Sequence, residues 1–182
     1  MKITISESQY KRLFEQEEYV LQIPSLEYFN NDWDLLEKYL KSKGNPLYSI
    51  GGDLDLRETP IESLGNLTSV GGYLFLKETS VESLGNLISV GGYLNLFGTS
   101  IESLGNLISV GGDLDLRETP IESLGNLTSV GGYLFLKKTS VESLGNLTSV
   151  GGTLDLRETP LSKMYDSDEI RKMVKVGGDL YL

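Results

Sequence analysis

Apolar residues in the middle of the chain follow a pattern that repeats every 20 residues. In the first copy, Leu54 and Leu56 alternate with polar residues, which is the two-residue period of a strand with one buried face. Ile61, Leu64 and Leu67 then follow at steps of three, which suits a 3₁₀-like or extended return segment better than an α-helix. Each copy is too small to bury its own leucines, so we expect successive copies to stack.

The copies share the consensus VGGxLxLxxTxIESLGNLxS, and a fixed period of this length is typical of a solenoid. The copies open with Gly-Gly pairs that begin at residues 51, 71, 91, 111, 131, 151 and 177. A column of threonines accompanies them, at residues 59, 79, 99, 119, 139 and 159. Residues 51–90 and 111–150 differ only at Glu78 against Lys138 and Ile88 against Thr148, which indicates that a three-unit block was duplicated.

Helical patterns flank the repeats, in residues 6–14, 31–44 and 166–173. The first begins with SESQ, which resembles a capping box, and the second places Trp33, Leu36 and Leu40 on one inward face. The third precedes a last strand in GGDLYL. Because open solenoid ends must be covered, we expect these helices to act as caps. The expected division is a helical N-terminal cap at 1–44, six repeats at 45–160 and a C-terminal cap at 161–182.

The segment LDLRETPI, residues 54–61, resembles the L-x-L-x-x-N-x-L motif of leucine-rich repeats. The resemblance covers residues 50–160 and the last strand, and it implies an α+β solenoid whose strands form one parallel sheet of about seven strands. Two departures matter: Thr59 stands where the family has Asn, and Gly51 stands where its first Leu would be. A plain parallel β-helix with stacked threonines is therefore the alternative.

Composition excludes several kinds of chemistry. The chain has no cysteine and no histidine, which removes disulfides, thiolate zinc sites and histidine-based nucleophilic catalysis. The net charge is −10, and residues 44–160 carry 6 basic and 14 acidic groups, which argues against nucleic-acid binding. No apolar run has the length of a signal peptide core or a membrane span. We expect a cytoplasmic protein with no membrane partner, no metal and no cofactor.

The residues between the leucines of each strand should face outward, in columns about 4.8 Å apart. These columns mix Asp, aromatic and basic residues, and clustered exposed aromatic rings usually mark an interaction surface. The segment YLNLFGTS, residues 93–100, breaks the charged columns with an aromatic residue. The predicted partner-binding residues are Tyr73, Phe75, Tyr93, Asn95, Phe97, Tyr133, Phe135, Arg57, Lys77 and Arg117.

We therefore expect a non-enzymatic interaction module for a protein or peptide. The first alternative is a structural protein that self-associates through the strand face or the edge at residues 179–182. The leader MKITISESQYKRLFEQE resembles amphipathic N-termini of tailed-phage proteins, so this alternative includes a location in a virion. A carbohydrate-active enzyme comes third, because Asp53 and Asp55 have a spacing usable by glycosidases, but the pair recurs as Asp113 and Asp115 instead of forming one unique centre.

Overall fold

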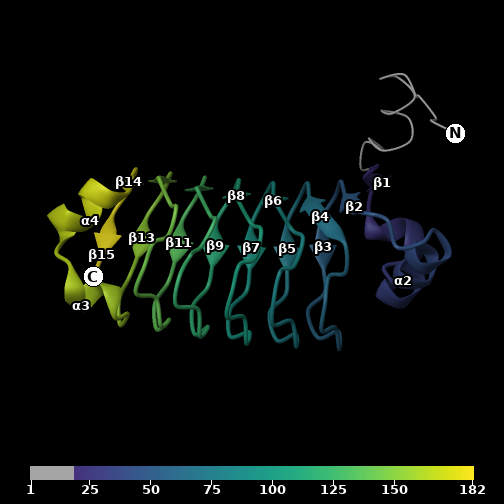
Figure 1. Ribbon diagram of the computed structural model, residues 1–182, viewed down its shortest axis with the longest axis horizontal. Coiled ribbons are helices and arrows are strands. Elements are labelled where there is room, and N and C mark those ends of the chain that lie inside the picture. The colour runs from purple at the N-terminus through teal and green to yellow at the C-terminus, as the bar shows by residue number, and fades with distance from the viewer. Residues whose placement is uncertain (1–18) are drawn as a thin grey trace, which may run out of the picture.

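The computed structural model describes residues 19–182, which form an elongated solenoid with a helical cap at each end (Figure 1). The helix expected at residues 6–14 lies outside the described residues. Two parallel sheets run along the stack of coils. The structure confirms the expected solenoid with a seven-stranded parallel sheet, and it adds a second parallel sheet that we did not expect from the sequence.

The seven-stranded sheet contains the leucine alternation, and neighbouring strands pair in register, Leu54 with Leu74 and so on along the stack. Its strands are β3 (Leu54–Asp55), β5 (Leu74–Phe75), β7 (Leu94–Asn95), β9 (Leu114–Asp115), β11 (Leu134–Phe135), β13 (Leu154–Asp155) and β15 (Leu180–Tyr181). The eight-stranded sheet contains β1 (Leu21–Ile23), β2 (Tyr48–Ile50), β4 (Leu67–Val70), β6 (Ser89–Val90), β8 (Ser109–Val110), β10 (Ser129–Val130), β12 (Ser149–Val150) and β14 (Lys175–Val176).

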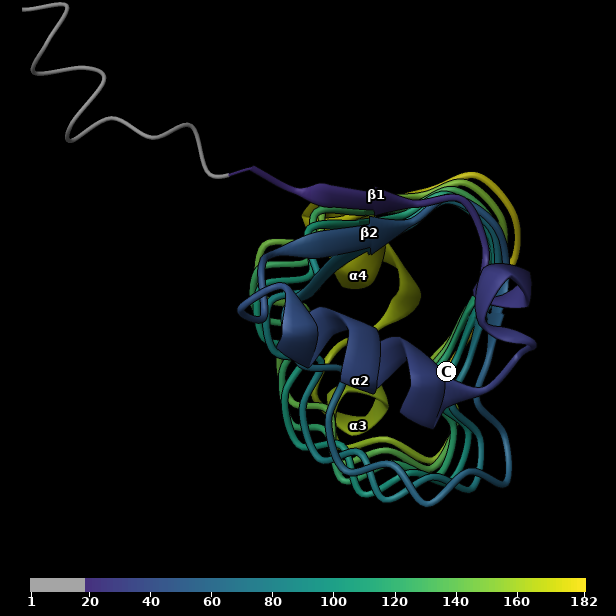
Figure 2. The same ribbon diagram turned by 90° about the vertical axis from the view of Figure 1, so that its right-hand side faces the viewer.

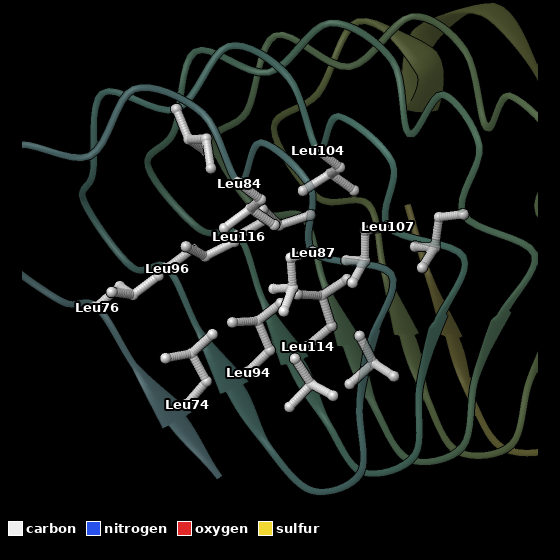
Figure 3. Close-up of a cluster of buried hydrophobic side chains, with 14 of the residues drawn as sticks. Leu74, Leu76, Leu84, Leu87, Leu94, Leu96, Leu104, Leu107, Leu114 and Leu116 are labelled. Carbon is white, nitrogen blue, oxygen red and sulfur yellow. The ribbon is translucent and has the colours of Figure 1, made fainter. Parts of the chain in front are cut away.

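Leucines from every coil fill the interior of the stack in columns. Figure 3 shows Leu74, Leu94 and Leu114 one behind another, with Leu84 and Leu104 in a second column. The first three are completely buried. Burying a leucine contributes about 1.5–3 kcal/mol, so the stacked columns supply the main driving force for folding.

Glycine and threonine residues determine how closely the coils pack and how each coil turns. A Cβ atom added to Gly71 would lie 2.2 Å from the carbonyl oxygen of Gly51, so only glycine permits this approach of neighbouring coils. The threonine column faces inward, and Thr99 is 3 % exposed. Its hydroxyl donates to the Leu96 carbonyl oxygen at 2.9 Å, so each threonine closes the turn of its own coil.

The N-terminal end of the core is covered by α2 (Trp33–Ser42), which follows the short 3₁₀ helix η1 (Leu26–Phe29). Figure 2 shows α2 lying across the end of the coil. Asp32 caps this helix by accepting a hydrogen bond from the Leu35 backbone at 3.1 Å. Trp33, Leu36 and Leu40 are buried, as their spacing predicts.

The C-terminal end is covered by α3 (Leu161–Met164) and α4 (Ser167–Met173), and α4 corresponds to the helix expected there. Asp166 and Glu169 form a complete capping box, and Ile170 packs into the core with no exposed surface. Arg171 donates from α4 to the carbonyl oxygens of Val176, at 3.4 Å, and Gly178, at 3.3 Å. This side chain therefore occupies backbone acceptors at the edge of the stack.

Candidate functional site: the outer face of the seven-stranded sheet

All ten predicted partner-binding residues lie on the strands of the seven-stranded sheet or within two residues of a strand end, next to the buried leucines. The structure brings four of them together, and we call these four the aromatic cluster: Tyr73, Phe75, Tyr93 and Phe97. Tyr73 is 49 % exposed and the other three are partly exposed. The cluster thus offers ring surface to solvent from two successive coils.

Edge contacts connect three rings of the aromatic cluster. The centroids of Tyr73 and Phe75 are 6.1 Å apart at an interplanar angle of 65°, and those of Phe75 and Tyr93 are 5.7 Å apart at 84°. Such edge-to-face pairs contribute about 0.5–1.5 kcal/mol beyond the area that they bury. The ring of Tyr73 also packs on Gly92, where an added Cβ would lie 2.3 Å from a Tyr73 ring carbon. The rings are therefore held in place by their neighbours.

Tyr93 is also held by a hydrogen bond, because its hydroxyl donates to Asp115 Oδ2 at 3.3 Å. Asn95, on the same coil, is smaller than the Phe75 and Phe135 that hold this position elsewhere. Burial, together with the negative charge of Asp115, raises the pKa of the Tyr93 hydroxyl to about 12. Tyr93 is therefore a neutral hydrogen-bond donor at physiological pH.

Phe97 occupies the column that holds arginine or lysine in the other five coils. The Lys77 ammonium and the Arg117 guanidinium lie 5.6 Å and 5.4 Å from its ring centroid. The next residue, Gly98, has a φ of 66°, and the same turn position has a positive φ in the other five coils, with Glu58 as one example. Glycine thus suits the positive φ of this turn. The segment YLNLFGTS therefore keeps the backbone of a regular repeat and differs only in its outward side chains.

The arginines beside the cluster are engaged by carboxylates. Arg57 and Arg117 each form a two-bond fork with the aspartate two residues earlier, Asp55 and Asp115. The side chain of Asp55 is 47 % exposed, whereas that of Asp115 is 2 % exposed. Hydrogen bonds from Arg57 hold the pKa of the Asp55 carboxyl below its ordinary value. These arginines therefore present flat stacking surfaces with little uncompensated charge.

The duplicated block repeats only part of this arrangement. Tyr133 and Phe135 form an edge contact with centroids 5.9 Å apart, equivalent to the contact of Tyr73 with Phe75. The following coil has Thr153 and Arg157 where the first block has Tyr93 and Phe97. The larger continuous aromatic surface is therefore confined to the first block.

The aspartates considered for catalysis have structural partners. Asp53 accepts a hydrogen bond from the Tyr73 backbone at 2.8 Å, and Asp113 accepts the equivalent bond from Tyr133 at 2.7 Å. Both oxygens of Asp55 accept from Arg57. The hydrogen bonds of Asp53 and Asp113 thus connect one coil to the next. Those of Asp55 stabilise the end of its own strand.

Two exposed isoleucines, Ile88 and Ile108, lie outside this face and were not among the predicted binding residues. The available signal was their position between the regular inward steps of the return segment.

Among residues 19–182, no cluster of three or more carboxylates has the arrangement of a metal site. Within the same range, none of the helices has the length and apolar character needed to cross a bilayer.

Comparison with known proteins gives no relative: no protein-family model, no curated protein and no solved structure matches this chain.

Proposed function

We propose that this protein is a non-enzymatic interaction module that binds a protein or peptide through the aromatic cluster. The observation that carries the proposal is the edge-packed series Tyr73, Phe75 and Tyr93 on a parallel sheet, with Phe97 beside it. Rings already fixed by their neighbours lose little conformational entropy when a partner covers them. Partly exposed aromatic groups with polar surroundings are also typical of binding hot spots.

The surroundings of the cluster favour a partner segment that is apolar at its centre. Arg57 stacks on Phe75 at 5.0 Å while its charge is compensated by Asp55. Arg117 stacks on Phe97 and is compensated by Asp115. A partner therefore gains contact area from these guanidinium planes without having to supply a matching charge at each of them.

Two substitutions that the chain itself uses elsewhere test the proposal. Tyr73→Asp copies Asp53 and Asp113, and Phe97→Lys copies Lys77 and Lys137, so the double variant should keep its fold. Affinity capture from cells of the source organism should recover a partner with the wild type and lose it with the double variant. The matched control is Tyr133→Asp, which makes the same change in the block that lacks a counterpart of Phe97. Undiminished capture by the double variant would contradict the proposal.

We also propose a family relationship and a location, from the LDLRETPI motif, the phage-like leader and the lack of a long apolar run in the sequence. They are a leucine-rich-repeat relationship and a cytoplasmic or virion-associated location. In the second candidate function, copies of the chain assemble in a particle. The sheet edge at residues 179–182 is one surface through which these copies would contact each other. The engagement of Asp53 and Asp55 in local hydrogen bonds favours a non-enzymatic role over carbohydrate chemistry.

A further inference from the structure

One side of the solenoid has no charged residue through five consecutive coils. Each coil contains the ten-residue segment SLGNLTSVGG or SLGNLISVGG, at residues 63–72, 83–92, 103–112, 123–132 and 143–152. Strands β4 to β12 of the eight-stranded sheet lie within these segments. In a chain with 23 % charged residues and a net charge of −10, this uncharged side contrasts with the seven-stranded sheet.

An apolar ridge stands at the middle of this side. Ile88 and Ile108 are each 45 % exposed, and they are adjacent, because the Ile108 backbone donates to the Ile88 carbonyl oxygen at 2.8 Å. Thr68 and Thr128 hold the same position in the coils on either side. Grooves flank the ridge, one of about 730 Å³ over the serine, valine and glycine columns and one of about 690 Å³ over the asparagine column. We call this surface the isoleucine face.

The ridge coincides with the centre of the sheet. The strand order is β1-β2-β4-β6-β8-β10-β12-β14, and the two isoleucines directly precede the central strands β6 and β8. A two-fold axis in the plane of contact, midway between these strands, would therefore overlay all eight strands on those of a second copy. The row Thr68, Ile88, Ile108, Thr128 has the same sequence in both directions, as a self-complementary contact requires.

We propose that the isoleucine face binds a second copy of this chain in an antiparallel two-fold dimer, with Ile88 of each copy against Ile108 of the other. Two copies with a net charge of −10 repel each other overall, and an uncharged side is where this repulsion opposes contact least. The opposing faces contain only uncharged side chains until β14, where Lys175 takes the place of Ser149. In the antiparallel arrangement Lys175 lies opposite β1, near the uncharged Gln22.

The size of the face is compatible with a reversible dimer. Eight strands spaced by about 4.8 Å and crossed by about five residues give a face of roughly 550 Å² per copy. The total of roughly 1,100 Å² is near the lower limit for specific interfaces, where transient complexes lie, so we expect a reversible dimer. This dimer does not depend on the proposed function, because the aromatic cluster lies on the other sheet and stays exposed.

Sedimentation velocity of the full chain from about 1 to 300 μM tests the proposal, and the expected result is a concentration-dependent shift from monomer to dimer. The variant Ile88→Thr/Ile108→Thr should raise the dissociation constant at least about 100-fold. Threonine already occupies this position at Thr148, where its hydroxyl donates to the Thr128 carbonyl oxygen at 2.9 Å, so the variant should fold. Ser109→Lys, which copies Lys175, should weaken the dimer by placing two cations in the contact.

The control Tyr73→Asp/Phe97→Lys should dimerise like the wild type, so failure of the dimer and failure of the proposed function are distinguishable. Added salt should leave dimerisation unchanged or strengthen it by screening the net repulsion, whereas a charge-driven contact on the other sheet would weaken. A monomer at every concentration overturns the proposal. So does a dimer whose affinity is the same in Ile88→Thr/Ile108→Thr.

Discussion

The guanidinium carbon of Arg117 lies 5.4 Å from the ring centroid of Phe97 in the preceding coil. On its other side it lies 5.2 Å from the centroid of Phe135 in the following coil. The same group holds the buried carboxylate of Asp115 through bonds of 2.9 and 2.6 Å. One side chain thus stacks between rings of two coils and neutralises a buried charge in its own coil.

Replacing this arginine by lysine should be more damaging than the same change in the first coil. A lysine cannot form the two-bond fork or stack between two rings, so Arg117→Lys should lower the free energy of unfolding by about 1–3 kcal/mol. Arg57→Lys is the matched control, because Asp55 is exposed and only the Phe75 ring covers the guanidinium. It should cost less than about 1 kcal/mol. Urea denaturation compares the two variants, and equal losses would contradict the proposed importance of burial.

Gly98 provides a test of backbone conformation at the aromatic cluster. Its φ is 66°, and an added Cβ would meet no atom within 4 Å, so the cost of Gly98→Ala is purely conformational. We expect a loss of about 1 kcal/mol in the free energy of unfolding. Glu58→Ala is the control, because Glu58 already has a Cβ atom at the equivalent turn of another coil, where φ is 61°. Thermal or urea unfolding should show the loss only in the glycine variant.

Much of the fold could be predicted because the interior is strictly periodic. Leu54 and Leu56 identify the buried face of a strand, and the 20-residue repeat places all equivalent leucines in register. The second sheet could not be predicted, because the buried residues around strands such as Ser89–Val90 come at steps of three, as in Leu87 and Val90, and lack the two-residue alternation of a strand. Their pairing depends on the stacking of whole coils, which is a tertiary effect.

The outward direction of the candidate site followed from the same alternation, but its detailed shape did not. Tyr73 and Tyr93 hold equivalent positions, yet the first packs on Gly92 and the second bonds to Asp115. The difference depends on their neighbours, among them Asn95 in place of a phenylalanine. Contacts between side chains of adjacent coils decide such differences, and a single repeat unit does not contain them.

Alkaline pH should destabilise the fold through Tyr93. Its folded-state pKa is raised to about 12, whereas an unfolded tyrosine titrates near 10. The stabilisation is therefore complete below about pH 10 and is lost as the pH rises toward about 12. Burial raises the pKa of Tyr48 as well, so the two tyrosines act in the same direction.

Tyr93→Phe should therefore reduce the loss of unfolding free energy between pH 9 and pH 11. Tyr73→Phe is the control, because it leaves the bond between Tyr93 and Asp115 in place and should retain the loss. Urea titrations at both pH values measure the difference for each protein. An identical alkaline loss in Tyr93→Phe and the wild type would show that this hydroxyl contributes nothing.

Arg171 should protect the C-terminal edge of the stack against uncontrolled association. Its guanidinium occupies the carbonyl oxygens of Val176 and Gly178, which would otherwise be free acceptors at the C-terminal edge of the eight-stranded sheet and in the segment directly after it. Arg171→Ala should leave the free energy of unfolding within about 0.5 kcal/mol of the wild type, because the side chain is exposed. The variant should form larger species in light scattering during prolonged incubation at high concentration. Lys172→Ala removes a neighbouring exposed charge without freeing a carbonyl, and equal association of the two variants would assign the effect to net charge instead.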